Sequence, residues 1–477
     1  MPTVIEPHLA QKLDAMRAVH ALPGPLIERF GQVLASAGRW DVFRMNPLRF
    51  ADAHGFTHHE CTDLMVLAAR VGLLDFDWNL LCPACGGVQV SDASIDDLGG
   101  DSYCHLCEVE VPMVLDEQVE VSFTINPGVR APEIDPFANV ENYLRANFSE
   151  NYEKSPELDA YVRSCVLDYF VVEPMGMVQV AVRMEPGRGL HLVCLDRHSA
   201  TWINAVGEPD PAGDMVSVEI GEKGLPPASL SVPPGPVTLL LRNTTATRSG
   251  VLTLEVDHAR VYQIIDAHPT REHAFMTGKM LLNHQLFREL FRVQSLNRGL
   301  RLNMRSRTIL FTDLRGSTAL YDRIGDLRAY ELIQDHFRIL SGAVRTHAGA
   351  IVKTMGDAVM ATFSTPRDGI LAATAMARGM ETLMHEDAAD LGIKIGLHEG
   401  PALAINAEDR IDYFGQTVNI AARVQGLAQA GELVVTESTH RAVGVEKALR
   451  EAGVLKETVD ANLRGVAQAT RVLRYGL

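Results

Sequence analysis

The sequence predicts a multidomain α+β protein, and three observations carry this prediction. The chain has 477 residues, more than one hydrophobic core normally organises. Apolar residues follow helical spacing near the N-terminus and strict alternation in the middle of the chain. Two Cys-x-x-Cys pairs stand between these regions. We therefore expect a helical region (1–78), a cysteine-centred region (79–117), a β-sandwich-like domain (118–265), a helical connector (266–306) and an α+β domain (307–477).

Composition and charge restrict the class of protein. Charged residues make up 22% and hydrophobic residues 47% of the chain, as in globular proteins. No apolar run reaches the roughly 18 residues of a membrane span, and no basic segment followed by an apolar one begins the chain. We therefore expect no membrane span and a cytoplasmic protein. The net charge of −16 argues against nucleic acid as a partner.

The helical region contains a helix–turn–helix pattern over residues 48–71. Thr57 and Glu60 have the spacing of a capping box, which predicts that a helix begins at His58. The second helix carries no basic cluster. Packing of the two helices is therefore favoured over DNA binding.

The cysteine-centred region predicts a zinc ribbon. Cys82 and Cys85 form one pair, Cys104 and Cys107 the other, and 18 residues separate the pairs. Each pair can supply two thiolates from one tight turn, and a hairpin can bring the pairs together. Four thiolate ligands leave no position for a catalytic water, so we expect one structural Zn²⁺. His105 lies inside the second pair and is an alternative ligand.

The pattern in the middle of the chain predicts a β domain, to which we assign a regulatory role. Alternating apolar residues begin at Val119–Ile125 and recur up to Val256, with Gly and Pro between the runs, which is typical of a β-sandwich. A helical insert is expected over 139–169. The basic connector that follows is expected either to present its arginines to solvent or to contact the acidic remainder. We expect the upstream regions to regulate the last domain through this connector, in response to an unknown ligand or protein.

The last domain places carboxylates beside an expected anion site. The apolar run from Thr308 ends at Asp313, and a Gly-Ser-Thr segment then leads into a helix expected near Ala319. The free N–H groups of a helix N-terminus bind phosphate. Asp357 follows at the tip of an expected hairpin, and two carboxylates near a phosphate suit Mg²⁺. Lys353 stands four residues before Asp357, so the tip holds either a surface ion pair or two groups that serve a reaction.

A third segment, Asp412 to Arg423, adds polar groups of another kind. Residues 417–429 have a helical pattern, which puts Asn419 and Arg423 on one face, one turn apart. An amide and a guanidinium on one face can orient a ribose and bind a phosphate. Taken alone, this pattern is equally that of a solvated helix face.

Three segments together resemble the catalytic domain of class III nucleotide cyclases: FTDLRGST, VKTMGDAVMATF and DYFGQTVNIAARV. The resemblance runs from about Arg307 to the C-terminus. It implies a ferredoxin-like core and a head-to-tail homodimer with active sites at the interface. It also implies two Mg²⁺ or Mn²⁺ ions per site, with the metals bound by one protomer and the base, ribose and α-phosphate contacts made by the other.

The resemblance further assigns individual residues. Asp313, Asp357 and the carbonyl of Leu314 match the metal ligands. The phosphate-binding loop matches Gly316, Ser317 and Thr318. Lys353 and Asp412 match the pair that recognises adenine. Asn419 matches the residue that orients the ribose, Arg423 the residue that stabilises the α-phosphate, and Arg464 a late basic residue that binds the triphosphate.

The base-recognising pair favours ATP as substrate. Adenine presents an acceptor at N1 and a donor at N6, which complement the donor Lys353 and the acceptor Asp412. Guanine reverses both positions and would leave mismatched polar groups. The expected activity is therefore formation of 3′,5′-cyclic AMP from ATP. The alternatives are a guanylate cyclase, or a non-catalytic nucleotide sensor whose zinc ribbon is an interaction module.

Overall fold

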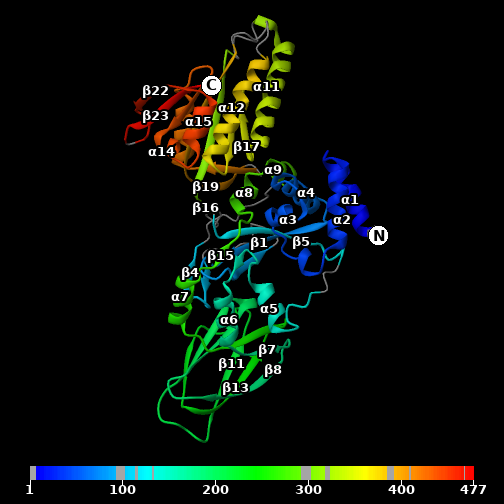
Figure 1. The fold of residues 1–477 in the computed structure, drawn as a ribbon, viewed down its shortest axis with the longest axis vertical. Helices are drawn as coiled ribbons and strands as arrows, with labels where there is room; N and C mark the ends of the chain where they lie inside the picture. The colour runs from blue at the N-terminus through cyan, green and yellow to red at the C-terminus, as the bar shows by residue number, and fades with distance from the viewer. Residues whose placement is uncertain are drawn as a thin grey trace.

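The computed structural model has three parts arranged along one long axis (Figure 1). A two-sheet β domain lies at one end, the C-terminal α+β domain lies at the other, and the N-terminal helices with a small sheet lie between them. The structure describes residues 7–92, 102–112, 117–130, 134–291, 302–316, 323–383, 391–407, 410–466 and 468–477. Within these residues, no helix has both the length and the apolar character that a membrane crossing requires.

The N-terminal helices form a core around α4. They are α1 (Pro7–Val19), α2 (Gly24–Ser36), η1 (Trp40–Val42), α3 (Pro47–His54) and α4 (His58–Arg70). The predicted capping box is confirmed, because Thr57 Oγ1 accepts from the Glu60 N–H at 3.1 Å and Glu60 Oε2 accepts from the Thr57 N–H at 2.9 Å. Every residue from Cys61 to Ala68 is buried, as expected of a helix inside a core. This burial disfavours the DNA-binding alternative for α4.

A three-stranded sheet follows, with order β2-β1-β5. Its strands are β1 (Leu74–Leu81), β2 (Val88–Asp92) and β5 (Val119–Ile125), and the separate hairpin has β3 (Ser102–Cys104) and β4 (Val109–Val111). Residues 119–125 were expected to open the β-sandwich-like domain, but they pair with β1, with Leu74 opposite Ile125. The difference has a physical reason: alternation shows that a strand has two unlike faces, and it does not identify the neighbouring strand.

The β domain has two sheets, with orders β12-β10-β9-β14-β7 and β11-β13-β8, which share one apolar core. The helical insert is two helices, α5 (Val140–Asn147) and α6 (Pro156–Cys165), with β6 (Tyr152–Glu153) between them. The strands are β7 (Val166–Val172), β8 (Met177–Met184), β9 (Gly189–Cys194), β10 (Ser199–Ala205), β11 (Asp214–Ile220), β12 (Ser229–Val232), β13 (Gly235–Asn243) and β14 (Ser249–Leu254).

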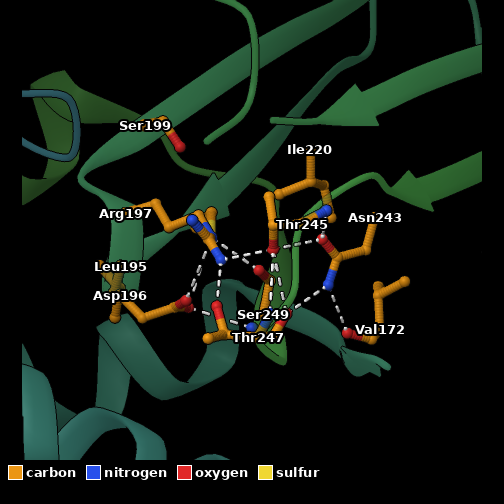
Figure 2. A network of polar contacts seen from close by, with 12 residues as sticks. Val172, Leu195, Asp196, Arg197, Ser199, Ile220, Asn243, Thr245, Thr247 and Ser249 are labelled. Carbon is orange, nitrogen blue, oxygen red and sulfur yellow. Dashed lines mark hydrogen bonds and ion pairs between the residues drawn. The ribbon is translucent and has the colours of Figure 1, made fainter. Parts of the chain in front are cut away.

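A polar network holds the turn between β13 and β14 (Figure 2). Arg197, in η2 (Leu195–Arg197), donates to the hydroxyls of Thr245 and Ser249, both at 2.8 Å. Asn243 Nδ2 donates to the Val172 carbonyl at 3.0 Å and to the Thr247 carbonyl at 2.7 Å. These bonds tie the side chains of the turn to Arg197 and satisfy the carbonyls of Val172 and Thr247, so we assign the network a structural role.

The connector follows α7 (His258–Ala267), which packs against α6, and begins with β15 (Arg271–Glu272), which pairs with β6. Its helices α8 (Gly278–Leu282) and α9 (Gln285–Leu290) contact the N-terminal region, and α9 also contacts β17 of the C-terminal domain. Arg288, one of its basic residues, is half-buried and donates to the Ile411 carbonyl at 2.6 Å. Arg288 therefore contacts the C-terminal domain and is not part of a solvated face.

The C-terminal domain has one sheet of order β17-β18-β16-β19-β21-β23-β22, with β20 paired to β19. The helix expected near Ala319 lies outside the described residues. The elements are β16 (Leu302–Arg315), α11 (Asp326–Thr346), β17 (Gly349–Met355), β18 (Ala358–Phe363), α12 (Pro366–Leu383), β19 (Gly392–Ala407), β20 (Arg410–Phe414), α13 (Gln416–Gln425), β21 (Glu432–Thr436), α14 (Glu437–His440), α15 (Val445–Ala452), β22 (Val454–Ala461) and β23 (Thr470–Gly476).

Gly349 is the first residue of β17. The left-handed position after α11 belongs to Ala348, with φ of 52°. A Cβ at position 349 would lie 2.3 Å from the Phe363 ring. Glycine is therefore required there for close packing of the strands.

The two faces of β16 belong to different cores. Leu310 and Leu314 lie in the core beneath α11 and α12, whereas Ile309 and Phe311 belong to the cluster that includes the N-terminal helices. Because side chains alternate along a strand, Asp313 lies on the same face as Ile309 and Phe311. The N-terminal region and the carboxylate-bearing face of the last domain thus share one continuous hydrophobic core.

Buried histidines make stability dependent on pH. His398 is buried beside Thr436, and burial lowers its pKa to about 4, against about 6.5 in an unfolded chain. The unfolded state therefore binds more protons between these two values, and the free energy of unfolding falls as pH falls below about 6.5. We expect His398 alone to remove about 1.4 kcal/mol at a pH of about 5.5. Urea unfolding at neutral and mildly acidic pH measures this loss, and a His398→Gln variant with the wild-type pH dependence would contradict it.

Candidate functional site

Lys353 and Asp412 form an ion pair, with 2.6 Å between Nζ and Oδ2. Lys353 lies near the end of β17 and Asp412 lies on β20, so the pair joins two strands that are not neighbours in the sheet. The Asp412 side chain is 18% exposed and that of Lys353 is 42% exposed. Asp412 Oδ1 also accepts from the Tyr413 N–H at 2.8 Å, which fixes the carboxylate. The lysine therefore pairs with Asp412, and not with its near neighbour Asp357.

Asp313 and Asp357 lie at the same end of two adjacent strands. β16 and β18 are antiparallel, with Phe311 opposite Met360, and continuing this register places Asp313 opposite the residue after Asp357. The Val359 N–H donates to Thr312 Oγ1 at 3.1 Å and ties the two strands at this point. The sheet thus brings together the two carboxylates that the sequence indicated.

The two carboxylates have different partners. Asp313 Oδ2 lies 3.0 Å from the ammonium of Lys394, its register partner on β19. Within the described residues, Asp357 Oδ2 is buried without a hydrogen-bond partner, while the backbone carbonyl of Asp357 accepts from His336 Nε2 at 3.1 Å. A buried carboxylate oxygen without a partner costs free energy, and a bound cation would satisfy it.

The remaining candidate metal and phosphate ligands surround the end of β16. Leu314 is buried, and Gly316 has φ of 86°, a left-handed turn that favours glycine. Ser317 and Thr318 lie outside the described residues. The strand end therefore carries Asp313, the Leu314 backbone and the tight turn in succession.

Asn419 and Arg423 lie one turn apart on α13, as predicted; Asn419 is exposed and Arg423 half-buried. A Cβ on Gly465 would lie 3.5 Å from Arg423 Nη2, so the loop that carries Arg464 lies beside this guanidinium. Arg464 itself is exposed. Two cationic side chains thus share one side of the domain.

Two groups of candidate residues make no polar contact with each other in the described part of the chain. Among the described residues, no hydrogen bond or ion pair joins Asp313 or Asp357 to the second group, which consists of Lys353, Asp412, Asn419 and Arg423.

Sequence reasoning missed two residues beside the carboxylates. The sequence around Lys394 could have indicated its role, since Lys394 is a lone cation between Ile393 and Ile395 in an apolar strand. The sequence around His336 could not, because the contact of His336 with Asp357 depends on how α11 packs against the hairpin.

The connector contacts the two strands that carry the ion pair. Gln285 Oε1 accepts from the Ile351 N–H at 2.8 Å, two residues before Lys353. Arg288 donates to the carbonyl of Ile411, the residue before Asp412. The positions of Lys353 and Asp412 are therefore mechanically linked to α9, which the sequence did not reveal.

The four cysteines form a separate cluster. The sulfur atoms of Cys82, Cys85, Cys104 and Cys107 all lie within 4.8 Å of one another, and none is in a disulfide. Cys85 Sγ and Cys104 Sγ are 3.9 Å apart, close to the edge of about 3.8 Å in a tetrahedron with Zn–S bonds of about 2.3 Å. The His105 ring packs against Tyr103 and is not in the cluster. The cluster could hold a metal ion with four sulfur ligands.

Two family models match the chain. The model described as a family of unknown function (DUF5939) matches residues 11–289. The model described as the adenylate and guanylate cyclase catalytic domain matches residues 303–470.

Individual relatives match the C-terminal domain. Adenylate cyclase 2 of Rhizobium meliloti (strain 1021) is 33% identical over 137 residues, which are 26% of this chain and 37% of that protein. The adenylate cyclase of Anabaena cylindrica is 29% identical over 153 residues, which are 29% of this chain and 30% of that protein. The chain thus spans about a third of the length of these relatives. The structure of the adenylyl cyclase CyaB from P. aeruginosa is 21% identical, with a TM-score of 0.31, and the match covers 36% of this chain and 93% of that one.

Proposed function

Because the chain belongs to the family of unknown function (DUF5939) and ends in a class III nucleotide cyclase catalytic domain, we propose that it is an adenylate cyclase. The reaction is attack of the ribose 3′-oxygen on the α-phosphorus of ATP. This attack forms the cyclic 3′,5′-phosphodiester and releases diphosphate as the leaving group. The observation that carries the choice of ATP is the ion pair between Lys353 and Asp412.

The ion pair presents one donor and one acceptor side by side. The Lys353 ammonium would donate to adenine N1, and the Asp412 carboxylate would accept from the N6 amino group. Asp412 is held by its own backbone contact and by the lysine, so its acceptor position is fixed before substrate binds. Guanine at this position would place its N1–H against an ammonium and its O6 against a carboxylate, which disfavours GTP.

The carboxylates fit two Mg²⁺ or Mn²⁺ ions. Asp313, Asp357 and the Leu314 carbonyl form a set of hard oxygen ligands, and the unpartnered Asp357 Oδ2 supports a cation at this place. Bound there, the ions would acidify the 3′-hydroxyl and neutralise the triphosphate. Lys394 would balance the charge of Asp313 while no metal is bound.

The other residues position the substrate and meet the developing charge. Asn419 would hydrogen-bond the ribose and aim its 3′-oxygen at the α-phosphorus. Arg423 would donate to the α-phosphate oxygens, where negative charge grows in the transition state. Gly316, Ser317 and Thr318 would hold the terminal phosphates together with Arg464.

We propose a homodimer in which each site takes Asp313 and Asp357 from one chain and the second group from the other. The lack of polar contacts between the two groups in the described part of the chain supports this arrangement. Met355 and Phe414 are 42% and 64% exposed and lie close in sequence to Lys353 and Asp412. Large apolar side chains exposed at the rim of a site suit a partner surface.

The cysteine cluster is proposed to hold one structural Zn²⁺. Replacing Cys104 with Ser should remove one equivalent of zinc per chain and destabilise the β1–β5 region by about 3 kcal/mol or more, since binding of structural zinc supplies folding energy. Zinc analysis and thermal unfolding measure both effects. The isolated Cys165 is the control, because Cys165→Ser should keep the zinc. Equal zinc content in the Cys104 variant and the wild type would contradict the proposal.

Product analysis tests the proposed reaction. We expect the purified chain with Mg²⁺ or Mn²⁺ to form cyclic AMP and diphosphate from an equimolar mixture of ATP and GTP. Cyclic GMP as the main product would establish the guanylate cyclase alternative. Nucleotide binding without any cyclic product under either metal would establish the non-catalytic sensor.

A further inference from the structure

A second cluster of metal-ligating side chains lies where α4 meets the connector. His59 and Asp63 stand one turn apart on α4, and His284 immediately precedes α9, which packs beside α4 (Figure 1). His59 Nε2 is 3.6 Å from Asp63 Oδ2, and His284 Nε2 is 3.4 Å from Asp63 Oδ1. The three ligand atoms lie within 4.8 Å of one another.

The buried members of this cluster lack partners. Asp63 is 5% exposed, and its Oδ1 makes no hydrogen bond within the described residues. Both ring nitrogens of His284 are likewise buried without a hydrogen bond. Buried polar atoms are normally paired, so the unpaired Asp63 Oδ1 and His284 Nε2, which face each other at 3.4 Å, indicate a missing ligand.

The distances identify the kind of ligand. The separations of 3.4 and 3.6 Å, each to a different oxygen of Asp63, are long for hydrogen bonds. They are close to the distance of about 3.4 Å between two ligands of a tetrahedral ion with bonds of about 2.1 Å to nitrogen and oxygen. Two imidazoles and one carboxylate suit Zn²⁺ and its neighbours in the first transition row better than Mg²⁺ or Ca²⁺. The His59 side chain is 45% exposed and gives an ion access to the buried ligands.

We propose that His59, Asp63 and His284 form a transition-metal site of the Zn²⁺ class, distinct from the four-cysteine cluster. Three protein ligands leave one coordination position for water. The site joins a helix of the N-terminal region to the connector, two segments separated by more than two hundred residues of sequence.

The site would control the base-recognising pair through α9. His284 is followed by Gln285, which accepts from the Ile351 N–H, and Arg288 one turn later donates to the Ile411 carbonyl. A metal that fixes His284 against α4 therefore fixes the helix that braces the strands of Lys353 and Asp412. This consequence for ATP binding rests on the proposed adenylate cyclase activity; the metal site itself does not.

Cobalt titration of the full chain tests the site. The cysteine cluster is first loaded with one equivalent of Zn²⁺ per chain, which four thiolates bind in preference to the proposed site, and unbound zinc is removed. Mg²⁺ is kept in excess and nucleotide is omitted. Co²⁺ bound by nitrogen and oxygen should then give weak visible d–d bands without the intense thiolate charge-transfer bands. Loss of a residue that only supports a metal ligand weakens metal binding about 10–100-fold. His59→Gln and Asp63→Asn remove ligands themselves, so each should weaken cobalt binding by at least this factor. The matched control is His58→Gln, because His58 is equally exposed on the same turn and pairs with Asp52.

The cobalt experiment tests the metal site independently of the proposed cyclase activity. Loss of the cobalt bands in His59→Gln but not in His58→Gln supports the site, whether or not the protein is an active cyclase. Equal cobalt binding by all variants overturns it. Absence of cobalt binding by the wild type also overturns it, and would mean that Arg345, whose charge acts on Asp63, neutralises this carboxylate instead. In an active enzyme, His59→Gln should raise KM for ATP more than it lowers kcat.

Discussion

Replacing Asp357 with Asn should abolish cyclic nucleotide formation without destabilising the protein. The substitution removes a metal-binding charge of the proposed site, so we expect kcat/KM to fall at least about 10³-fold, as when a key charge-stabilising group is lost. In the absence of metal, the buried Asp357 Oδ2 has no hydrogen-bond partner in the described part of the chain, so the neutral amide should leave the free energy of unfolding unchanged or raise it by about 1 kcal/mol. Initial rates and urea unfolding measure the two effects.

This prediction distinguishes a metal ligand from a structural residue, because activity is lost while the free energy of unfolding is kept or raised. A residue that only held the hairpin together would lose activity and stability together. Asp335→Asn is the matched control: Asp335 lies on α11, pairs with Arg338 within one helical turn, and should keep both activity and stability. Wild-type activity of the Asp357 variant at saturating metal would rule out its assignment as a metal ligand.

Reversing the polarity of the base-recognising pair should convert the substrate preference. Lys353→Glu alone would place a carboxylate against Asp412 in place of the 2.6 Å ion pair, so it should lose ATP activity without gaining GTP activity. Adding Asp412→Ser removes the like charge and supplies a hydroxyl donor for guanine O6. We expect the ratio of kcat/KM for GTP to that for ATP to rise at least about 100-fold in the double variant, because mismatched buried polar groups are rejected by larger factors.

Competition between the two nucleotides measures this ratio. Lys447→Glu controls for charge reversal, since Lys447 lies exposed on α15 and pairs only weakly with Glu451, 4.0 Å away. An unchanged preference for ATP in the double variant would show that Lys353 and Asp412 do not contact the base.

Local patterns explain what the sequence could predict. The capping box at Thr57 and Glu60 depends on two residues three positions apart, and it forms as predicted. The two cysteines of each pair approach each other because each pair spans one tight turn, and the second pair lies at the turn of the β3–β4 hairpin. Asp313 and Asp357 end adjacent strands of one short β-α-β-β segment, so their proximity also follows from short-range order.

Contacts between distant segments could not be predicted in this way. The strand 119–125 has the alternation of a sandwich strand, but it pairs with β1. Ile309 and Phe311 give the pattern of a buried strand, which does not reveal that the N-terminal helices cover one of its faces. The cluster of His59, Asp63 and His284 joins segments that share no local periodicity. These features depend on how the three parts pack, and the proposed control of the site acts through them.

Subunit complementation tests the central claim most directly, namely that one adenylate cyclase site is built from two chains. Asp313→Ala and Asn419→Ala should each be inactive alone. Mixed in equal amounts and allowed to exchange subunits, they form heterodimers in half of the pairs, each with one intact site of two, so cyclic AMP formation should recover to about one quarter of the wild-type rate. Failure of two folded, dimerising variants to complement would contradict a shared site.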